Sequence, residues 1–564
     1  MLSYRKLAMR VLGRPLHTEG IDSPRPASQR AAAFVLTAAM LTTLAAPAFA
    51  ATWRIEDGDI TVKAGETEGT NKVSQGTNKD VVDTNTIITN RDKNTASSHT
   101  VTIKTNDKND TVEVTLKDVN IDASSRNEAA VSVTGSGNTT IKLDGDNHLT
   151  GGISDNGSYG LSGISSSGSL TISGGETDSL TAQGGSGTDG SGGRGIFSKD
   201  LTISGGTVNA NGGDGKNGSG GSGITSLGSL TISGGTVNAA GGDGTNSSDG
   251  GDGITNNRGV TISSGGTVTA KGGSGEDGSG GRGISSFGGV TISSGGTVTA
   301  TGGNSTGSDG SGGDGISSTS TTISGGTVTA DGGSGNFSGG NGIRSFDVAI
   351  SGGTVNVAGG NGGNGSGSDV GNGIYSSGID LSGSLELTAK AGSPNGKALS
   401  QRGNELDLNT IKDKLGPGAK VTTNANGETK EVSIPRPVEP EKPVIPGESS
   451  SSSDGGSATS SAPASSLPGL TVTDKDGQRI SYTSTQSGNT LTVCVGRFTA
   501  SLRASLSTLR QLRAEGIETI TFQTILCSTT LSVDELLAMG GEDAEVVLTH
   551  HIRSSTLTVG GKAV

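Results

Sequence analysis

A repeat of about thirty residues is the feature that most constrains how this chain can fold. Each repeat contains three short segments in which apolar and hydroxyl residues alternate: Gly-Ile-x-Ser, Leu/Val-Thr-Ile-Ser and Thr-Val-Thr/Asn-Ala. Alternation of this kind is typical of strands that bury one face. The isoleucine of the first segment recurs at Ile164, Ile196, Ile224, Ile254, Ile284, Ile316, Ile343 and Ile374. The repeat therefore predicts coils of three strands each.

Stacking such coils into a parallel β-helix also explains an unusual composition. The 564 residues include 101 glycines, and only 29% are hydrophobic and 2% aromatic. Collagen is excluded because glycine has no three-residue period. A disordered chain is the other reading, but disorder does not require apolar residues in phase. We predict about eleven or twelve stacked coils with inward ladders of isoleucine and valine, joined at Ser-Gly-Gly by turns in which glycine adopts positive φ.

The remaining sequence predicts three further regions. Basic residues, an apolar run from Ala31 to Ala46 and a small-residue ending are typical of an export signal, so we expect cleavage near Ala50 and a secreted or cell-surface protein. No second apolar run long enough to span a membrane follows. The predicted domains are a signal peptide at 1–50, a β-helix at 51–433 with regular repeats at about 151–390, a Pro/Ser/Gly-rich linker at 434–468 and a small α/β domain at 469–564.

The C-terminal region is predicted from local patterns. Strands are expected at 490–495, 517–524 and 546–549, a helix at 501–515, and a second helix after the capping box that begins at Ser532. Cys494 and Cys527 are expected to form a disulfide in an exported protein. His550 and His551 are expected at a solvated strand end. This domain is a candidate for contact with cell wall or a surface partner.

Net charge and a search for catalytic motifs argue against two classes of function. A formal net charge of −13 disfavours nucleic acid as a partner. A nucleophilic triad needs a histidine near its nucleophile, and no histidine falls within the regular repeats. Arg282 should stack between Asp252 and Asp314, which we interpret as structural. We therefore expect a protein that is not an enzyme, with a polysaccharide lyase as the alternative left open.

The passage from Thr140 to Gly152, with Leu-Asp-Gly-Asp-Asn at its centre, and the Thr-Ile-Ser-Gly-Gly-Thr-Val phrases resemble secreted bacterial carbohydrate-binding β-helix proteins, relatives of the pectate-lyase-like superfamily. The resemblance covers residues 90–400 approximately. It implies a right-handed parallel β-helix, polysaccharide binding and bound calcium. Loop carboxylates suit a hard cation. The candidate calcium ligands are Asp144, Asp146, Asp214, Asp243, Asp252, Asp277, Asp309 and Asp314.

Polysaccharide binding is the leading functional prediction. A flat face of hydroxyl and amide groups is the expected contact surface, formed by Asn209, Asn238, Thr269, Thr299, Thr329 and Asn356. Aromatic residues are sparse, and for Phe287 and Phe346, at equivalent turns, two roles stay open, contact with sugar and filling of the turn. The alternative function is a cell-surface adhesin or structural spacer that binds proteins.

Overall fold

The computed structural model describes two parts of the chain. It covers residues 51–436 except 247, 294 and 364–369, and residues 470–563 except 475–477, 481, 488, 496, 498, 525–527, 540–543, 551–554 and 561. The predicted signal peptide and residues 437–468 of the predicted linker lie outside the described residues.

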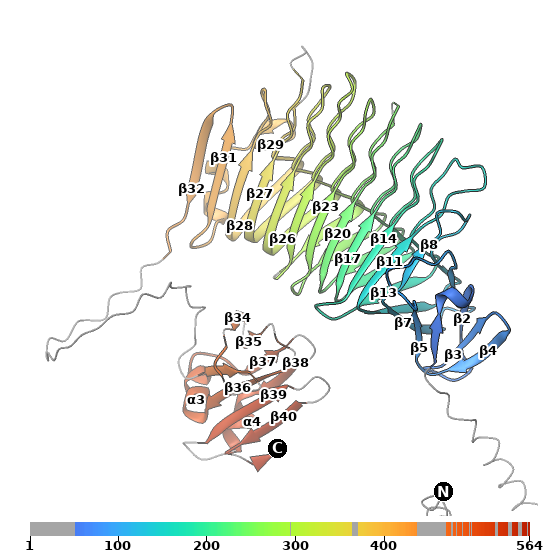
Figure 1. Ribbon diagram of the computed structural model, residues 1–564. Coiled ribbons are helices and arrows are strands. Elements are labelled where there is room, and N and C mark those ends of the chain that lie inside the picture. Colours follow the sequence, from blue (N-terminus) through green and yellow to red (C-terminus); the bar gives the residue numbers. More distant parts are fainter. Residues whose placement is uncertain are drawn as a thin grey trace, which may run out of the picture.

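Residues 51–436 form a parallel β-solenoid of about 13 turns, which confirms the predicted fold class (Figure 1). We call each turn a rung. The first strand series follows the Gly-Ile pairs: β12 (Ile164–Ser166), β15 (Ile196–Ser198), β18 (Ile224–Ser226), β21 (Ile254–Asn256), β24 (Ile284–Ile292), β26 (Ile316–Asp331), β27 (Ile343–Ala358), β28 (Ile374–Lys390) and β29 (Leu399–Gln401). From β24 onward a single bent strand covers two or all three of the predicted segments.

The other two series complete each rung. The second contains β13 (Ser169–Ser173), β16 (Asp200–Ile203), β19 (Ser229–Ile232) and β22 (Gly259–Ile262). The third contains β14 (Ser179–Gln183), β17 (Thr207–Asn211), β20 (Thr236–Ala240), β23 (Thr267–Lys271), β25 (Thr297–Thr301) and β31 (Lys420–Ala425). Parallel pairing runs unbroken from rung to rung, for example from β17 to β20 and from β20 to β23.

Both ends of the solenoid are irregular. The N-terminal rungs contain β1 (Thr52–Arg54), β2 (Ile60–Ala64), β3 (Asn71–Gln75), β4 (Asn78–Asp83), β5 (Thr86–Thr89), β6 (Val101–Lys104), β7 (Thr111–Lys117), β8 (Asn120–Asp122), β9 (Val131–Thr134), β10 (Asn138–Asp144) and β11 (Asp146–Thr150). The antiparallel strands β2, β3 and β4 lie at the start, and the antiparallel hairpins β29–β30 (Asn404–Glu405) and β31–β32 (Glu428–Ser433) lie at the end. Short 3-10 helices occupy Ile55–Asp57, Leu408–Thr410 and Lys412–Lys414.

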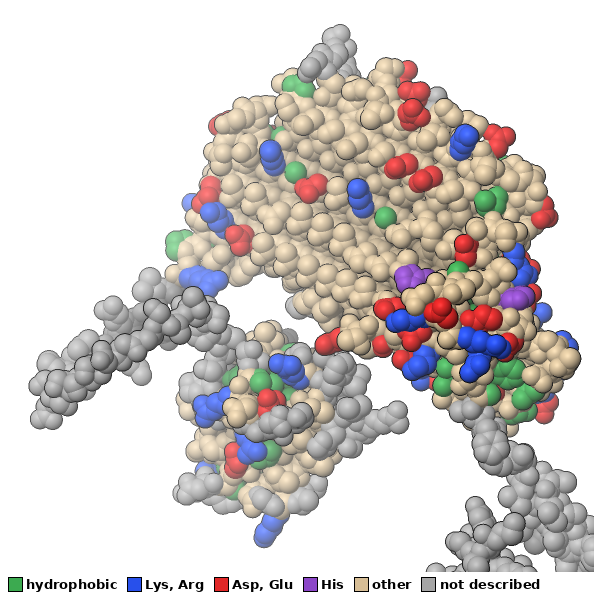
Figure 2. All heavy atoms as spheres, in the orientation of Figure 1, with side chains coloured by type: hydrophobic (Ala, Val, Ile, Leu, Met, Phe, Trp, Pro, Cys, Tyr) green, Lys and Arg blue, Asp and Glu red, His purple; other side chains and the backbone are tan. Residues whose placement is uncertain are grey.

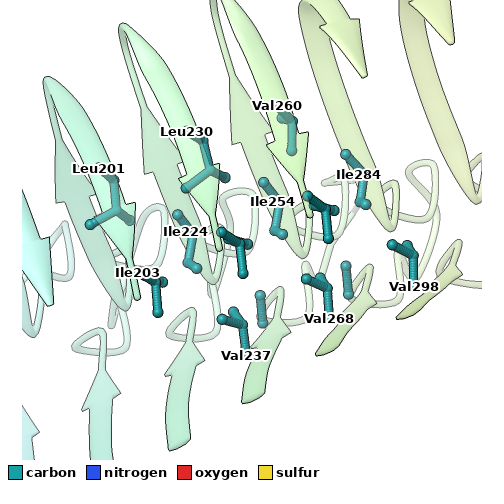
Figure 3. Packing of buried hydrophobic residues seen from close by; sticks show 14 of the residues in the cluster. Leu201, Ile203, Ile224, Leu230, Val237, Ile254, Val260, Val268, Ile284 and Val298 are labelled. Carbon is teal, nitrogen blue, oxygen red and sulfur yellow. The ribbon is translucent and has the colours of Figure 1, made fainter. Parts of the chain in front are cut away.

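The core consists of the predicted ladders of aliphatic side chains (Figure 3). Ile203, Ile232 and Ile262 are consecutive register partners and are fully buried, as are the equivalent isoleucines of later rungs. Val208, Val237 and Val268 form a second such ladder. Burial of each side chain of this size contributes about 1.5–3 kcal/mol. A narrow core of this kind needs no aromatic residues, because every rung buries the same small set of aliphatic side chains.

Glycine has two structural roles in each rung. Gly206, in the Ser-Gly-Gly turn, has φ +77, which confirms the predicted conformation. In the glycine-rich loops, which project side by side from one edge of the solenoid (Figure 1), successive backbones approach too closely for side chains. A Cβ atom on Gly221 would lie 1.9 Å from the Gly193 carbonyl oxygen. The loops are instead joined by backbone hydrogen bonds such as Gly213 N to Gly193 O at 2.8 Å.

The described residues between 470 and 563 form two sheets and two helices with a core of their own. One sheet contains β33 (Leu470–Thr473), β36 (Ala500–Ser505), β39 (Glu545–His550), β40 (Ser555–Val559) and β41 (Lys562–Ala563), and the other contains β34 (Thr483–Ser487), β35 (Thr490–Cys494), β37 (Thr519–Gln523) and β38 (Ser528–Ser532). The helices are α3 (Leu506–Ala514) and α4 (Val533–Ala538). Neither helix is long or apolar enough to cross a membrane, nor is any other helix in the described parts of the chain.

The predicted helix at 501–515 is wrong in its first turn. Residues up to Ser505 belong to β36, which pairs with β33 and β39 and buries Ala500, Leu502 and Ala504 in alternation. The helix begins only after Ser505, whose side chain accepts a hydrogen bond from Thr508 N at 3.1 Å. Leu502 also fits the apolar spacing of the helix, so the sequence pattern does not reveal where the strand ends and the helix begins. Ser532 caps the second helix as predicted, with Glu535 N donating to the Ser532 hydroxyl.

Candidate functional site

The six residues predicted to contact polysaccharide form one continuous row. Asn209, Asn238, Thr269, Thr299, Thr329 and Asn356 are consecutive register partners on the outward face of the third strand series. Asn238 Nδ2 donates to Asn209 Oδ1 at 2.8 Å. A parallel row of threonines, from Thr207 to Thr354, lies beside it. The structure therefore contains the flat polar face, and ligand binding by it stays a prediction.

The predicted calcium ligands do not meet at one site. The described residues contain no group of three histidine, cysteine, aspartate or glutamate side chains that could hold a metal ion. Asp144 pairs with Lys117 at 2.7 Å, and Asp146 accepts from the Ser179 hydroxyl at 3.0 Å, both on N-terminal rungs. Asp277 and Asp309 are exposed on loops. The side chains therefore provide no preformed cage for a hard cation.

The other four aspartates connect neighbouring rungs through backbone amides. Asp214 Oδ1 accepts from Asp243 N at 2.9 Å, and Asp243 Oδ1 accepts from Ser274 N at 2.6 Å. Asp252 Oδ1 accepts from Arg282 N at 2.7 Å. Asp314 also accepts a backbone hydrogen bond from the following rung. This ladder of carboxylates explains why aspartate recurs in the loops, and calcium binding stays a prediction.

A groove of about 880 Å³ lies where the glycine-rich loops meet the first strand series. From Ser222 onward, the residue that precedes each Gly-Ile pair lines this groove. The following glycine is required because the rungs touch there: a Cβ atom on Gly283 would lie 2.6 Å from the Gly315 carbonyl oxygen. We define the groove by Ser222, Asp252, Arg282, Asp314, Asn341, Arg344, Asn372, Tyr375 and Lys397.

Two arginines and one buried carboxylate form the charged centre of the groove. Asp314 is only 6% exposed, and its Oδ1 accepts from both Asn341 N and Asn341 Nδ2 at 2.8 Å. Its Oδ2 lies 4.0 Å from Arg282 Nε and 4.0 Å from Arg344 Nη1. The predicted stacking of Arg282 between Asp252 and Asp314 is therefore confirmed. Both guanidinium groups remain exposed and retain hydrogen-bond donors for a ligand.

Asp252 forms part of the floor of the groove. Burial raises the pKa of the Asp252 carboxyl above its usual range, although hydrogen bonds from Arg282 N and neighbouring hydroxyls oppose that shift. The Asp252 carboxylate accepts from Thr255 Oγ1 at 3.0 Å, and that hydroxyl lies 3.0 Å from Ser222 Oγ. The floor of the groove is thus a hydrogen-bonded network of acid, hydroxyl and amide groups.

An aromatic ring and two amides complete the C-terminal half of the groove. Tyr375 is the register partner of Arg344 and is 41% exposed. Asn372 Nδ2 donates to Asn341 Oδ1 at 2.9 Å, which fixes the orientation of both amides. An exposed ring beside fixed donors and acceptors can stack on one face of a sugar while binding its hydroxyls.

Sequence reasoning did not single out Arg344, Tyr375 or Lys397. The available signal was the position within the repeat. Lys397 precedes Ala398-Leu399, which replaces Gly-Ile in the last rung, and Arg344 and Tyr375 both follow the repeated isoleucine. On the face seen in Figure 2, charged side chains are sparser over the repeat region than over the N-terminal rungs.

The C-terminal predictions have different outcomes. His550 is fully buried rather than solvated, because β39 continues through it into the sheet. Its ring nitrogens lie 3.2 Å from Thr524 Oγ1 and 2.9 Å from Thr529 Oγ1. Cys494 Sγ lies 3.2 Å from Gln523 Oε1. Cys527 and His551 lie outside the described residues, so the Cys494–Cys527 disulfide stays a prediction.

Comparison with protein-family models, with curated proteins and with solved structures returned no match to this chain. The parallel solenoid is consistent with the β-helix superfamily that the sequence resembles. Any functional assignment therefore rests on the groove and its chemistry.

Proposed function

We propose that this chain is an exported, non-catalytic polysaccharide-binding protein and that the groove is its binding site. The observation that carries the proposal is the line from Arg282 through Asp314 and Arg344 to Tyr375, in which exposed donors and an exposed ring follow the solenoid axis. A linear polymer can contact successive rungs, which are about 4.8 Å apart. The C-terminal domain is then available for contact with cell wall or another surface partner.

Pull-down of the full chain on a panel of insoluble and immobilised polysaccharides tests this proposal. Parallel samples contain calcium or a chelator, and released sugar is assayed in each. Retention without released product supports a binding protein, and loss of retention on chelation would support the predicted calcium. Unsaturated or reducing-end product would instead favour a polysaccharide lyase. Failure to bind any glycan would contradict the proposal and favour the adhesin or spacer function.

Variants locate the binding site. The double variant Arg344→Ala/Tyr375→Ala is expected to weaken retention at least about ten-fold, because it removes a donor and a stacking surface. The matched control is Lys104→Ala/Tyr159→Ala, which removes an exposed cation and an exposed ring outside the groove. Thr269→Ala/Thr329→Ala tests the flat polar face. Loss of binding in that variant alone would move the site from the groove to the flat face.

A further inference from the structure

A row of exposed apolar side chains follows the corner after the first strand series. Leu227, Phe287 and Phe346 are 45%, 71% and 67% exposed. We call these three residues the apolar ridge. Of the two roles left open for Phe287 and Phe346, this exposure disfavours filling of the turn. The corners are aligned because the residue before each corner is in parallel register with the one on the next rung. These residues are Ser226, Asn256, Ser286, Ser318 and Ser345.

The apolar residues of the ridge occupy alternate rungs. Asn257 occupies the corner between Leu227 and Phe287, and Thr319 occupies the corner between Phe287 and Phe346. Both intervening residues are exposed and polar. Apolar surface therefore recurs every two rungs, or about 9.6 Å, with hydrogen-bonding groups halfway between.

A strip of small residues connects the ridge to the groove. Thr225 and Ser285 point away from the core, yet they are only 5% and 6% exposed. Among the described residues, the Thr225 hydroxyl has no hydrogen-bond partner. The next residue of this strip, Thr255, is hydrogen-bonded to Ser222 and Asp252 of the groove. In register, the strip continues through Ser317 into Arg344 and Tyr375 of the groove, and the ridge lies two residues further along each rung.

The period of the ridge identifies a class of ligand. In an extended β-1,4-linked chain of hexopyranoses, consecutive sugars are rotated by about half a turn, so the same apolar face recurs in every second sugar. Two rungs are close in length to one disaccharide of such a chain. A helical α-1,4-linked chain has no such repeat. We infer that the ridge is a second contact row of the glycan site and that it selects extended, two-fold β-1,4-linked chains.

A hollow extends this row beyond Leu227. It has a volume of about 610 Å³ and is lined by Phe197, Leu227, Lys199 and Arg258, together with Ser166 and Ser167. Ser167 occupies the corner two rungs before Leu227, which is the position of the next apolar contact in the same period. The Phe197 ring, 5.2 Å from the Arg194 guanidinium carbon, lines this hollow from the rung immediately before Leu227, so the two-rung period of the ridge ends at Leu227.

This inference rests on the proposed function, and the choice of ligands separates the two. Calorimetric titration of the full chain with cellohexaose, mannohexaose and maltohexaose compares two β-1,4-linked chains with an α-1,4-linked chain. We expect the β-1,4-linked hexaoses to bind at least about ten-fold more tightly. Equal or tighter binding of maltohexaose would overturn the inference and leave polysaccharide binding intact. Absence of binding to every glycan in both this titration and the pull-down would overturn both.

A pair of variants tests the spacing itself. Phe287→Ala/Phe346→Ala removes the rings, whereas Phe287→Thr/Thr319→Phe keeps the composition but places the two rings on adjacent rungs. We expect both to bind cellohexaose at least about ten-fold more weakly, and Phe337→Ala, which removes a 52% exposed ring from a loop, to bind as the parent does. Full binding by the exchanged variant would overturn the two-rung match. Loss of self-association in the alanine variant, with cellohexaose affinity unchanged, would identify the ridge as a contact between copies.

Discussion

At the scale of single residues, His550 is a buried titratable group. Burial lowers its pKa, its ring lies 4.8 Å from the Phe522 ring, and two threonine hydroxyls lie within hydrogen-bond distance of its nitrogens. Because the folded-state pKa lies below that of the unfolded chain, the neutral ring contributes stability above the unfolded pKa of about 6.5. That contribution is lost as pH falls from there toward the folded-state pKa.

The C-terminal domain should therefore open more readily at about pH 5.5 than at about pH 7.5. Amide hydrogen exchange of residues 517–524 and 545–550, corrected for the intrinsic pH dependence of exchange, measures this opening. His550→Gln is expected to abolish most of the difference between the two pH values. An unchanged difference in that variant would assign the pH dependence to another group.

At the scale of elements, the glycine-rich loops depend on close backbone contact between rungs. Gly221→Ala would place a Cβ atom 1.9 Å from the Gly193 carbonyl oxygen, which the backbone must move to accommodate. We expect a loss of about 1–3 kcal/mol in unfolding free energy, measured by urea denaturation of the solenoid. Gly259→Ala is the control, because its nearest neighbour would be 3.5 Å away and it needs no positive φ. Equal stability of the two variants would contradict the role assigned to the loops.

The same scale shows what the sequence could predict. The repeat period fixes the register between rungs, so the sequence predicts the ladder of Ile203, Ile232 and Ile262. For the same reason it predicts the row of six polar residues from Asn209 to Asn356. The start of α3 was missed because Leu502 satisfies strand and helix periods at once. The sequence does not predict the groove. Periodicity gives the register of the strands, but it does not show that the loops and the first strands enclose a common space.

At the scale of the whole molecule, the solenoid converts a one-dimensional repeat into a linear binding surface. The groove extends from Ser222 to Lys397, a span of about 29 Å along the axis if each rung adds about 4.8 Å. A ligand that follows the axis gains contacts with every sugar added until it covers this span. A ligand held in one local pocket gains nothing beyond its first sugars.

The most direct test of the account is therefore the dependence of affinity on ligand length. We predict that the dissociation constant of the full chain for β-1,4-linked oligosaccharides falls at least about ten-fold between the disaccharide and the hexaose, and that Arg344→Ala/Tyr375→Ala removes most of this gain. A disaccharide that binds as tightly as the hexaose, or a length dependence unchanged in the groove variant, would contradict it.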